Sequence, residues 1–570
     1  MNRNTELHFS QTPQIDIKRS KFDESFSMKT TWNVGDIIPI YVDSDILPGD
    51  TVQMDMASLV RMATPIYPIM DNLYMDTYFF FVPHRLTWEH WAEFWGENED
   101  PWTQQTEYEI PQISAPSGGW TEGTIADYMG IPTKRNGLSI NALPFRAYAK
   151  IWNDWFRNEN TKTNCHIYKD ETTRTGVNSG NYVTATELGG KPCKAAKMHD
   201  YFTSALPEPQ KGDPVQIPVG GLAPVTGTLS FTNNIPVRTE AQEHLSGSAA
   251  VPMKFVKSTG TTWQGGMLGV DSDRTMKITG SPSTFSQFTV EPSNLYARVT
   301  GAPIDINGLT ADLSQATAAT VNQLRTAFAI QKYLENAGLH GTRYIEYIRS
   351  VFGVTSSDAR MQRAEYLGGV RTPINIDQIL QTSSTDATSP QGNTSGFSCT
   401  IDSNSLFTKS FEEHGTLMGL AVIRTEHTYQ QGLSKMWTRK KWTDFYNPFF
   451  ANLGEQAILN ENIYAQGTTQ DKEAFGYQEA WAEYRYKPNY VTGYMRSNAT
   501  GSLDVWHFAD NYNSLPMLSS DWMDEPYTNV DRTIAVTSQL THQFIGDFYF
   551  KTYYTRPMPV YSVPGLIDHV

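Results

Sequence analysis

Cysteine, charge and long apolar runs are all scarce in this 570-residue sequence. The three cysteines, Cys165, Cys193 and Cys399, form no CxxC pair, so no disulfide framework is expected and folding in a reducing cytosol fits. No stretch approaches the ~18 consecutive apolar residues of a membrane-spanning helix. Met1–Gln14 is polar and lacks the apolar core of a secretory signal peptide. Neither membrane insertion nor secretion is therefore expected.

Charged residues make up 18% of the chain, against about 25% in an average soluble protein. Serine, threonine, asparagine and glutamine fill the gap at roughly 28%. Aromatic residues reach 12%, which excludes intrinsic disorder. Two interpretations stay open: a large β-protein with polar loops, or a protein whose surface mostly faces other subunits, because interface cores are poor in charge and rich in aromatics. The net charge of −15 argues against a whole-chain polyanion binder.

Enzyme motifs are also missing. The sequence contains no GxxxxGK[ST], no GxGxxG after a strand, no GxSxG and no HExxH. We therefore assign no catalytic residue and no cofactor.

One group of residues has the chemistry of a zinc site. Cys165, His166, Cys193 and His199 are all of ligating types, but an adjacent Cys–His pair is poor for tetrahedral closure. Polar loop residues are the favoured interpretation, and no metal is predicted.

One pair of carboxylates lies near aromatics, as in a glycosidase cleft. Glu89 and Glu93 are spaced to share a helix face beside Trp88 and Trp91. A solvated helix edge is the favoured interpretation.

The secondary structure is expected to be mainly strands, with helices in the middle of the chain. The run Tyr78–Val82 is too continuous for a strand with one wet face and should be buried on both faces. The expected strands are Thr30–Val42, Thr51–Met62, Leu73–Val82, Thr416–Tyr429, Leu503–Phe508, Asp531–Thr537 and Gln543–Tyr554. The expected helices are Thr87–Trp95, Pro144–Asn158, Thr320–Ala337 with Gly338 as its terminator, and Thr342–Phe352.

Early and late strands must pair across hundreds of residues, which suits a β-barrel or jelly roll with swollen loops. Residues 207–301 are dense in Gly, Pro, Ser and Thr, yet too long and too aromatic for a linker. They indicate an inserted β-rich subdomain.

Lys435–Trp442 is the clearest basic cluster. It combines four cations with two indoles, namely Lys435, Arg439, Lys440, Lys441, Trp437 and Trp442. Cations that neutralise phosphates beside indoles that stack bases are typical of a surface for single-stranded nucleic acid. The alternative is that the indoles pack beneath the aliphatic stems of the lysines. A weaker candidate is the N-terminal arm, with Arg3, Lys18, Arg19 and Lys21.

Eight long aromatic segments resemble one family. They are Thr77–Leu86, Pro144–Arg157, Asp200–Gly212, Gly341–Val354, Tyr366–Ile376, Thr428–Trp437, Gly476–Pro488 and Arg556–Val570. Together they resemble the major capsid proteins of gokushoviruses (Gokushovirinae, Microviridae), small single-stranded DNA bacteriophages. Residues 158–197 and 211–301 do not look like fixed family sequence.

The resemblance implies a single capsid domain over residues 1–570: an eight-stranded antiparallel jelly roll with large helical and β insertions. It implies about sixty copies in a T = 1 icosahedral shell around circular single-stranded DNA, and no enzymatic activity. The insertion at 211–301 would form a threefold surface protrusion for host attachment, with Phe231, Trp263 and Phe285 as candidate host contacts.

The resemblance also implies partners and a location. The partners are other copies of the chain, the packaged DNA, a small basic packaging protein, a minor or pilot capsid protein and a host cell-surface receptor. The protein would be part of a virion assembled in the host cytoplasm. About sixty subunits of charge −15 give a shell of roughly −900, which cannot neutralise a genome, so DNA contacts must be local.

Two other classes of protein remain as alternatives. A secreted jelly-roll carbohydrate-binding protein would use exposed aromatic rings against sugar, and a β-rich glycosidase would need paired carboxylates facing one cleft.

Overall fold

A computed structural model describes residues 18–97, 106–216, 321–383, 385 and 390–561, together with the backbone of short strands between 225 and 311. The chain divides into two units, residues 1–214 with 331–570, and residues 215–330. The expectations for 211–301 fall mostly on residues outside the described ranges.

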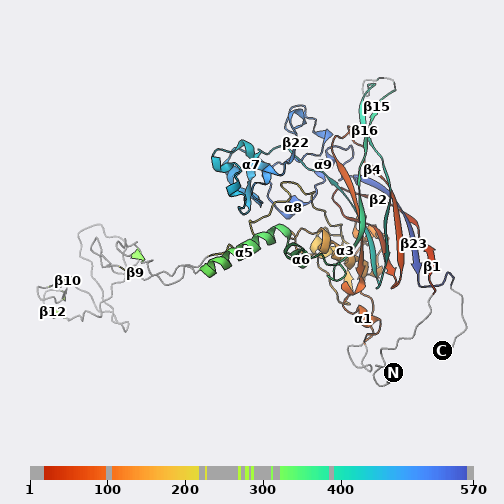
Figure 1. The fold of residues 1–570 in the computed structure, drawn as a ribbon, viewed down its shortest axis with the longest axis horizontal. Coiled ribbons are helices and arrows are strands. Elements are labelled where there is room, and N and C mark those ends of the chain that lie inside the picture. Colours follow the sequence, from red (N-terminus) through yellow and green to blue (C-terminus); the bar gives the residue numbers. More distant parts are fainter. Residues whose placement is uncertain are drawn as a thin grey trace, which may run out of the picture. The chain divides into compact units, whose positions relative to one another are not determined.

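The first unit is built on two antiparallel sheets (Figure 1). Sheet A holds β1 (Ser20–Asp23), β2 (Phe26–Trp32), β4 (Thr51–Met62), β17 (Thr400–Ser410) and β23 (Phe544–Arg556). Sheet B holds β3 (Ile38–Ile46), β5 (Leu73–Pro83), β14 (Glu365–Pro373) and β18 (Gly415–Thr425). The expected mainly β, antiparallel architecture is confirmed.

The order within each sheet joins distant parts of the chain. In sheet A, β23 lies between β4 on one side and β1 and β2 on the other, followed by β17 next to β4. In sheet B the order is β14, β5, β18, β3. The pair Phe26↔Phe550 shows the predicted pairing of early and late strands.

The main core lies between the two sheets. Phe79 of β5 faces Phe407 of β17 and Phe550 of β23, with ring centroids 6.0 and 6.4 Å apart. Alternate residues of β23 point outward, so that Ile545 and Tyr549 are exposed while their neighbours are buried. Sheet A therefore has one covered face and one open face.

Sheet B is covered on both faces, as the run Tyr78–Val82 predicted. Phe79 and Phe81 enter the core between the sheets, whereas Phe80 and Val82 enter a second core on the other side. The helix α3 (Leu143–Ile151), continued by a π-helical turn at Trp152–Phe156, closes this second core. The predicted helix at Pro144–Asn158 is confirmed to within two residues.

Short elements complete the first unit. The other helices are α1 (Trp91–Phe94), α2 (Ile125–Tyr128), α4 (Tyr182–Ala185), α6 (Tyr344–Phe352), α7 (Asn460–Ile463), α8 (Ser520–Met523) and α9 (Thr528–Asp531). The small sheets pair β6 (Gln112–Ser114) with β7 (Ser139–Asn141) and β8 (Arg174–Thr175), β15 (Ile376–Leu380) with β16 (Thr394–Ser398), β19 (Thr428–Tyr429) with β22 (Asn489–Tyr490), and β20 (Gln456–Leu459) with β21 (Ala474–Gln478).

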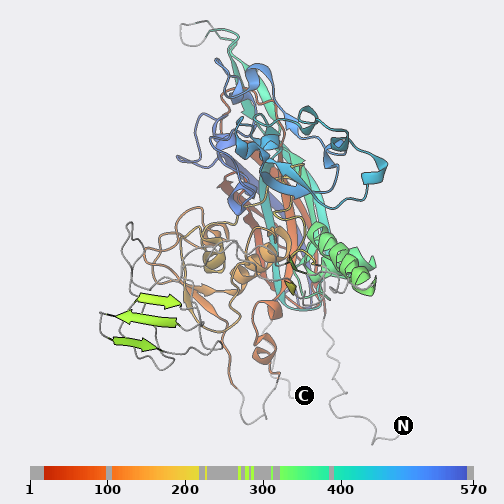
Figure 2. The same cartoon turned by 90° about the vertical axis from the view of Figure 1, so that its left-hand side faces the viewer.

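The second unit contains short strands. Figure 2 shows the antiparallel sheet of β10 (Met267–Val270), β11 (Met276–Gly280) and β12 (Thr284–Gln287). A second pair joins β9 (Val225–Thr226) to β13 (Thr310–Ala311). The helix α5 (Val321–His340) carries the boundary between the units, which falls after Ile330.

Three predicted helix and strand limits are wrong for local reasons. The Thr87 hydroxyl donates to the His84 carbonyl and closes a 3₁₀ turn, so it does not start a helix, and α1 is a single later turn. Gly338 does not end α5. It lies within the helix, where an added Cβ would come 3.3 Å from Leu206, and Gly341 with φ +84° follows the helix instead. Thr30–Val42 forms two strands, because a turn at Gly35 with φ +77° separates β2 from β3.

Two predicted strands do not form. Residues 503–508 contain a 3₁₀ turn, and residues 531–537 hold the end of α9 followed by turns and one isolated bridge, from Ile534 to Pro65. Arg532 explains the first case, because its guanidinium donates to the carbonyls of Asp504 and His507, each at 3.0 Å, and to that of Ala509 just beyond, at 2.8 Å. These carbonyls bond to a side chain instead of a neighbouring strand.

No helix in the described part of the chain is both long and apolar enough to cross a bilayer.

Candidate nucleic-acid interface

The basic cluster Lys435–Trp442 begins with one 3₁₀ turn, Lys435–Trp437, and runs into a second, Trp442–Asp444. The Asp444 carboxylate accepts hydrogen bonds from the backbone N–H groups of Lys440 and Lys441, each at 2.8 Å. These two bonds hold the pKa of Asp444 below its ordinary value, so it stays charged and fixes the loop. The loop therefore presents its two central lysines on a defined backbone.

The four cations of the cluster fall into two pairs. Lys435 and Arg439 both face the Glu483 carboxylate, at 3.6 and 3.2 Å. The Arg439 guanidinium also lies over the Tyr484 ring, 4.5 Å from its centroid. Lys440 and Lys441 are exposed. The cations that a polyanion can reach are therefore Lys440 and Lys441.

The indoles of the cluster are open to solvent. Trp437 and Trp442 each keep 71% of their surface exposed, so the alternative in which they pack beneath lysines is wrong. Further rings and apolar side chains around them are also exposed, namely Met436, Phe445, Tyr446, Phe449, Tyr484 and Tyr486. An exposed apolar patch of this kind marks an interaction surface.

The other predicted binding residues are only partly described. Lys18, Arg19 and Lys21 are exposed, and the Lys21 ammonium lies 3.9 Å from the Tyr553 ring centroid. Arg3 lies outside the described residues. So do the candidate host contacts Phe231 and Trp263, and Phe285 belongs to β12, of which only the backbone is described.

The weak zinc candidate separates into a buried pair and two surface residues. Cys165 and Cys193 are buried, and both sulfurs contact the Thr186 hydroxyl, at 3.5 and 3.3 Å. Burial raises the pKa of the Cys193 thiol well above its ordinary value. His166 and His199 are exposed. Within the described ranges, no three His, Cys, Asp or Glu side chains are arranged to hold a metal ion.

The carboxylate pair Glu89 and Glu93 does not share a helix face, because α1 begins only at Trp91. Trp88 is fully buried, and its indole N–H donates to Glu171 at 3.1 Å. It offers no ring surface to a sugar.

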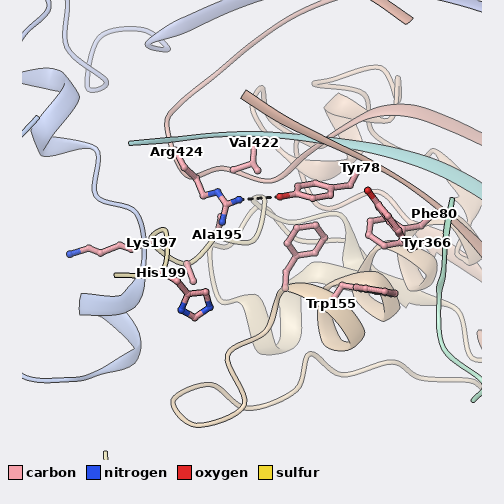
Figure 3. Close-up of a pocket in the computed structure, with 11 residues that line it drawn as sticks. Tyr78, Phe80, Trp155, Ala195, Lys197, His199, Tyr366, Val422 and Arg424 are labelled. Carbon is pink, nitrogen blue, oxygen red and sulfur yellow. Dashed lines mark hydrogen bonds between the residues drawn. The ribbon is translucent and has the colours of Figure 1, made fainter. Parts of the chain in front are cut away.

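A pocket that the sequence did not reveal lies on the outer face of sheet B (Figure 3). Its volume is about 270 Å³. Strand residues Tyr78, Phe80 and Arg424 line it together with Trp155 of the π-helical turn and Tyr366 of β14. These residues come from four separate parts of the chain.

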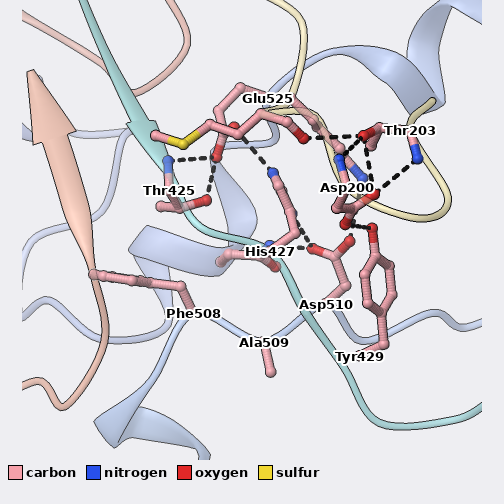
Figure 4. A network of polar contacts seen from close by, with 12 residues as sticks. Asp200, Thr203, Thr425, His427, Tyr429, Phe508, Ala509, Asp510 and Glu525 are labelled. Atoms are coloured by element: carbon pink, nitrogen blue, oxygen red, sulfur yellow. Dashed lines mark hydrogen bonds and ion pairs between the residues drawn. The ribbon is translucent and has the colours of Figure 1, made fainter. Parts of the chain in front are cut away.

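A buried polar network lies where β18 ends (Figure 4). His427 Nδ1 is 3.1 Å from Asp510, and its Nε2 is 3.0 Å from Glu525. Lys197 also contacts Asp510, at 3.2 Å, and Glu525 accepts hydrogen bonds from the backbone and hydroxyl of Thr425. Two cations thus balance two carboxylates.

The network holds His427 in its charged form. Burial alone lowers the pKa of an imidazole, but the charges of Glu525 and Asp510 outweigh it and raise the pKa of His427 to about 10. The pKa of Asp510 lies well below its ordinary value, because Lys197 and His427 outweigh the effect of its burial. The network is closed to solvent and ties four chain segments together, which is a structural role.

Comparison with known proteins identifies the class. The model of the capsid protein (F protein) family matches residues 10–566. The capsid protein VP1 of Spiroplasma virus 4 is 44% identical over 99% of this chain and 98% of that protein. The capsid protein VP1 of Bdellovibrio phage phiMH2K is 42% identical over 99% and 98%, and that of Chlamydia phage 1 is 38% identical over 98% and 97%.

The antiparallel sheets and these matches define a structural capsid protein of a bacteriophage, a virion component and not an enzyme. The chain belongs to the capsid protein (F protein) family, and the resemblance to gokushovirus major capsid proteins is confirmed. The class of capsid proteins replaces both alternatives, the secreted carbohydrate-binding protein and the glycosidase.

Proposed function

We propose that about sixty copies of the chain form a T = 1 icosahedral shell around a circular single-stranded DNA genome. The observation that carries this is the match to phage capsid proteins over 98–99% of the chain. The test is electron cryo-microscopy of purified particles, with extraction of the nuclease-protected nucleic acid. A sixty-subunit shell containing circular single-stranded DNA is the expected result. A different subunit number or a double-stranded genome contradicts the proposal.

The sandwich is proposed to be an eight-stranded jelly roll. Its support is the strand order, in which every step from one long strand to the next crosses to the other sheet, except the step from β5 to β14, which are neighbours in sheet B. Sheet A is ordered β2, β23, β4, β17, and sheet B is ordered β3, β18, β5, β14. The chain crosses from one sheet to the other within four successive strand pairs. These pairs are β2 with β3, β4 with β5, β14 with β17, and β18 with β23. This alternation is what a double Greek key requires.

DNA contact is proposed at the exposed part of the basic cluster, with Lys440, Lys441, Trp437 and Trp442 as its centre. The support is exposure of both charge and ring surface on one loop. Lys435 and Arg439 then act by holding the loop against Glu483. Arg3, Lys18, Arg19 and Lys21 remain a second candidate contact.

The charge of the chain supports further partners. A subunit of −15 cannot balance the genome's negative charge by its own net charge, so a small basic packaging protein is proposed to supply cations inside the shell. A minor or pilot capsid protein completes the particle, and assembly takes place in the host cytoplasm.

Residues 211–301 are proposed to form a threefold protrusion that attaches to a host receptor, with Phe231, Trp263 and Phe285 as candidate contacts. Deleting residues 220–290 should leave shells that assemble but do not adsorb to host cells. Normal adsorption of the deleted particles contradicts this role.

A further inference from the structure

The pocket on the outer face of sheet B has exposed rings held in place before any ligand arrives. Trp155 and Tyr366 keep 37% and 41% of their surface exposed, with ring centroids 5.6 Å apart. The Trp155 indole N–H donates to the Ala364 carbonyl at 2.9 Å, and the Arg363 guanidinium lies 4.0 Å from the Trp155 ring centroid. These contacts fix the indole, so little side-chain entropy is lost when a flat ligand stacks nearby.

The charge beside the pocket is positive. The Asp76 carboxylate contacts both Arg371 and Arg424, so one anion serves two cations. Arg424 also donates to the Tyr78 hydroxyl at 3.0 Å, and its Nη1 bonds to no residue of the described chain. None of the residues lining the pocket is acidic. A ligand with a negative group therefore meets a guanidinium that shares its one carboxylate partner, Asp76, with Arg371.

Lys197 and His199 also line this pocket, but they differ in how far they are exposed to solvent. Lys197 lines it but is buried and bonded to Asp510, and Figure 3 shows its amine directed away from Tyr78 and Arg424. His199 is exposed, so its ring is open to a ligand. The accessible polar groups are thus the Arg424 guanidinium and the His199 imidazole.

We infer that this pocket binds one nucleotide of single-stranded DNA, with the base against the exposed rings and the phosphate beside Arg424 and His199. A flat aromatic base next to an anion is the chemistry that rings and a guanidinium recognise together. The volume of about 270 Å³ is below the ~300 Å³ at which pockets for drug-sized ligands begin, which suits a single base. The inference rests on the proposed packaging of DNA, but the site is separate from the Lys440–Lys441 loop.

The test measures binding of an oligothymidylate to the full-length subunit, which does not depend on packaging. Tyr366→Ala removes an exposed ring, and we expect affinity to fall about tenfold. His199→Gln keeps an exposed polar group but removes the imidazole, and affinity should fall less. Tyr549→Ala is the matched control, because Tyr549 is 47% exposed on the open face of sheet A. It should bind like the unchanged protein.

A second ligand separates stacking from charge. An abasic deoxyribose-phosphate oligomer of equal length should bind more weakly, and Tyr366→Ala should not weaken it further. Equal binding of both oligomers, or equal oligothymidylate affinity in all three variants, overturns the inference.

Ultraviolet cross-linking of intact particles, read by mass spectrometry, then locates the contact. A nucleotide adduct on Trp155 or Tyr366 is expected. A peptide of another virion protein cross-linked there, without a nucleotide adduct, overturns the inference. Particles without DNA contradict the proposed function, whereas the oligothymidylate result still decides the pocket.

Discussion

The imidazole of His427 and the carboxylate of Glu525 lie 3.0 Å apart with both side chains completely buried. The two residues are 98 positions apart and join the end of β18 to the segment before α9. A buried charge pair is costly to break, because the remaining partner stays in the interior without compensation. This pair therefore sets the first prediction.

Replacing His427 by glutamine should lower the free energy of unfolding by about 3–5 kcal/mol, because Asp510 and Glu525 then face each other without a cation between them. Chemical denaturation at pH 7 measures the change. His166→Ala is the control, since His166 is exposed. A loss in His427→Gln no greater than in the control contradicts the prediction.

The same histidine predicts a pH dependence. The pKa of His427 is raised from 6.5 to about 10, so the folded protein binds a proton that the unfolded chain releases between these values. The stabilisation is complete below pH 6.5 and is lost as the pH rises towards 10. The free energy of unfolding should therefore fall more steeply between pH 7 and 9 in the unchanged protein than in His427→Gln. Parallel pH profiles of the two proteins rule this out.

The core between the sheets predicts a large loss for one ring. Phe79→Ala removes a fully buried side chain that contacts Phe407 and Phe550, and the free energy of unfolding should fall by about 3–5 kcal/mol. Tyr549→Ala, on the open face of β23, should cost far less. Similar midpoints in urea for the two variants contradict a core between these sheets.

The basic loop predicts an effect on DNA without an effect on shell formation. The double variant Lys440→Ala with Lys441→Ala should form particles that contain less DNA. The slope of oligothymidylate affinity against salt should fall by about 0.7 for each lysine that contacts a phosphate.

Lys29→Ala with Lys551→Ala is the matched control for this loop, because both lysines are exposed on sheet A. If the Lys440→Ala, Lys441→Ala variant keeps the salt slope and the DNA content of the unchanged protein, the loop does not contact DNA. The exposed indoles then belong to an interface with another partner.

Local sequence determined the strands well where burial is regular. Thr51–Met62 was predicted with its observed limits, and the unbroken apolar run Tyr78–Val82 correctly indicated a strand covered on both faces. The strand expected at Leu503–Phe508 failed because a distant guanidinium, that of Arg532, takes its carbonyls. Propensity contains no information about such a partner.

The candidate sites were predictable only in composition. The cluster at Lys435–Trp442 can be recognised from the sequence alone. Which of its cations are paired and which are exposed depends on Glu483, which is more than forty positions away. The pocket beside Trp155 and the network around His427 were missed entirely. Each joins residues from several segments, and no periodicity or spacing connects them.

The place of β23 fixes when a subunit can become ready to join others. This strand, the last of the sandwich to be synthesised, lies inside sheet A, so β4 on one side and β2 on the other lack their neighbour until it arrives. At about 5–20 residues per second, the wait is on the order of a minute. The growing chain thus carries two unfinished sheet edges throughout translation, and closing the sheet is the step that separates a nascent polypeptide from a building block.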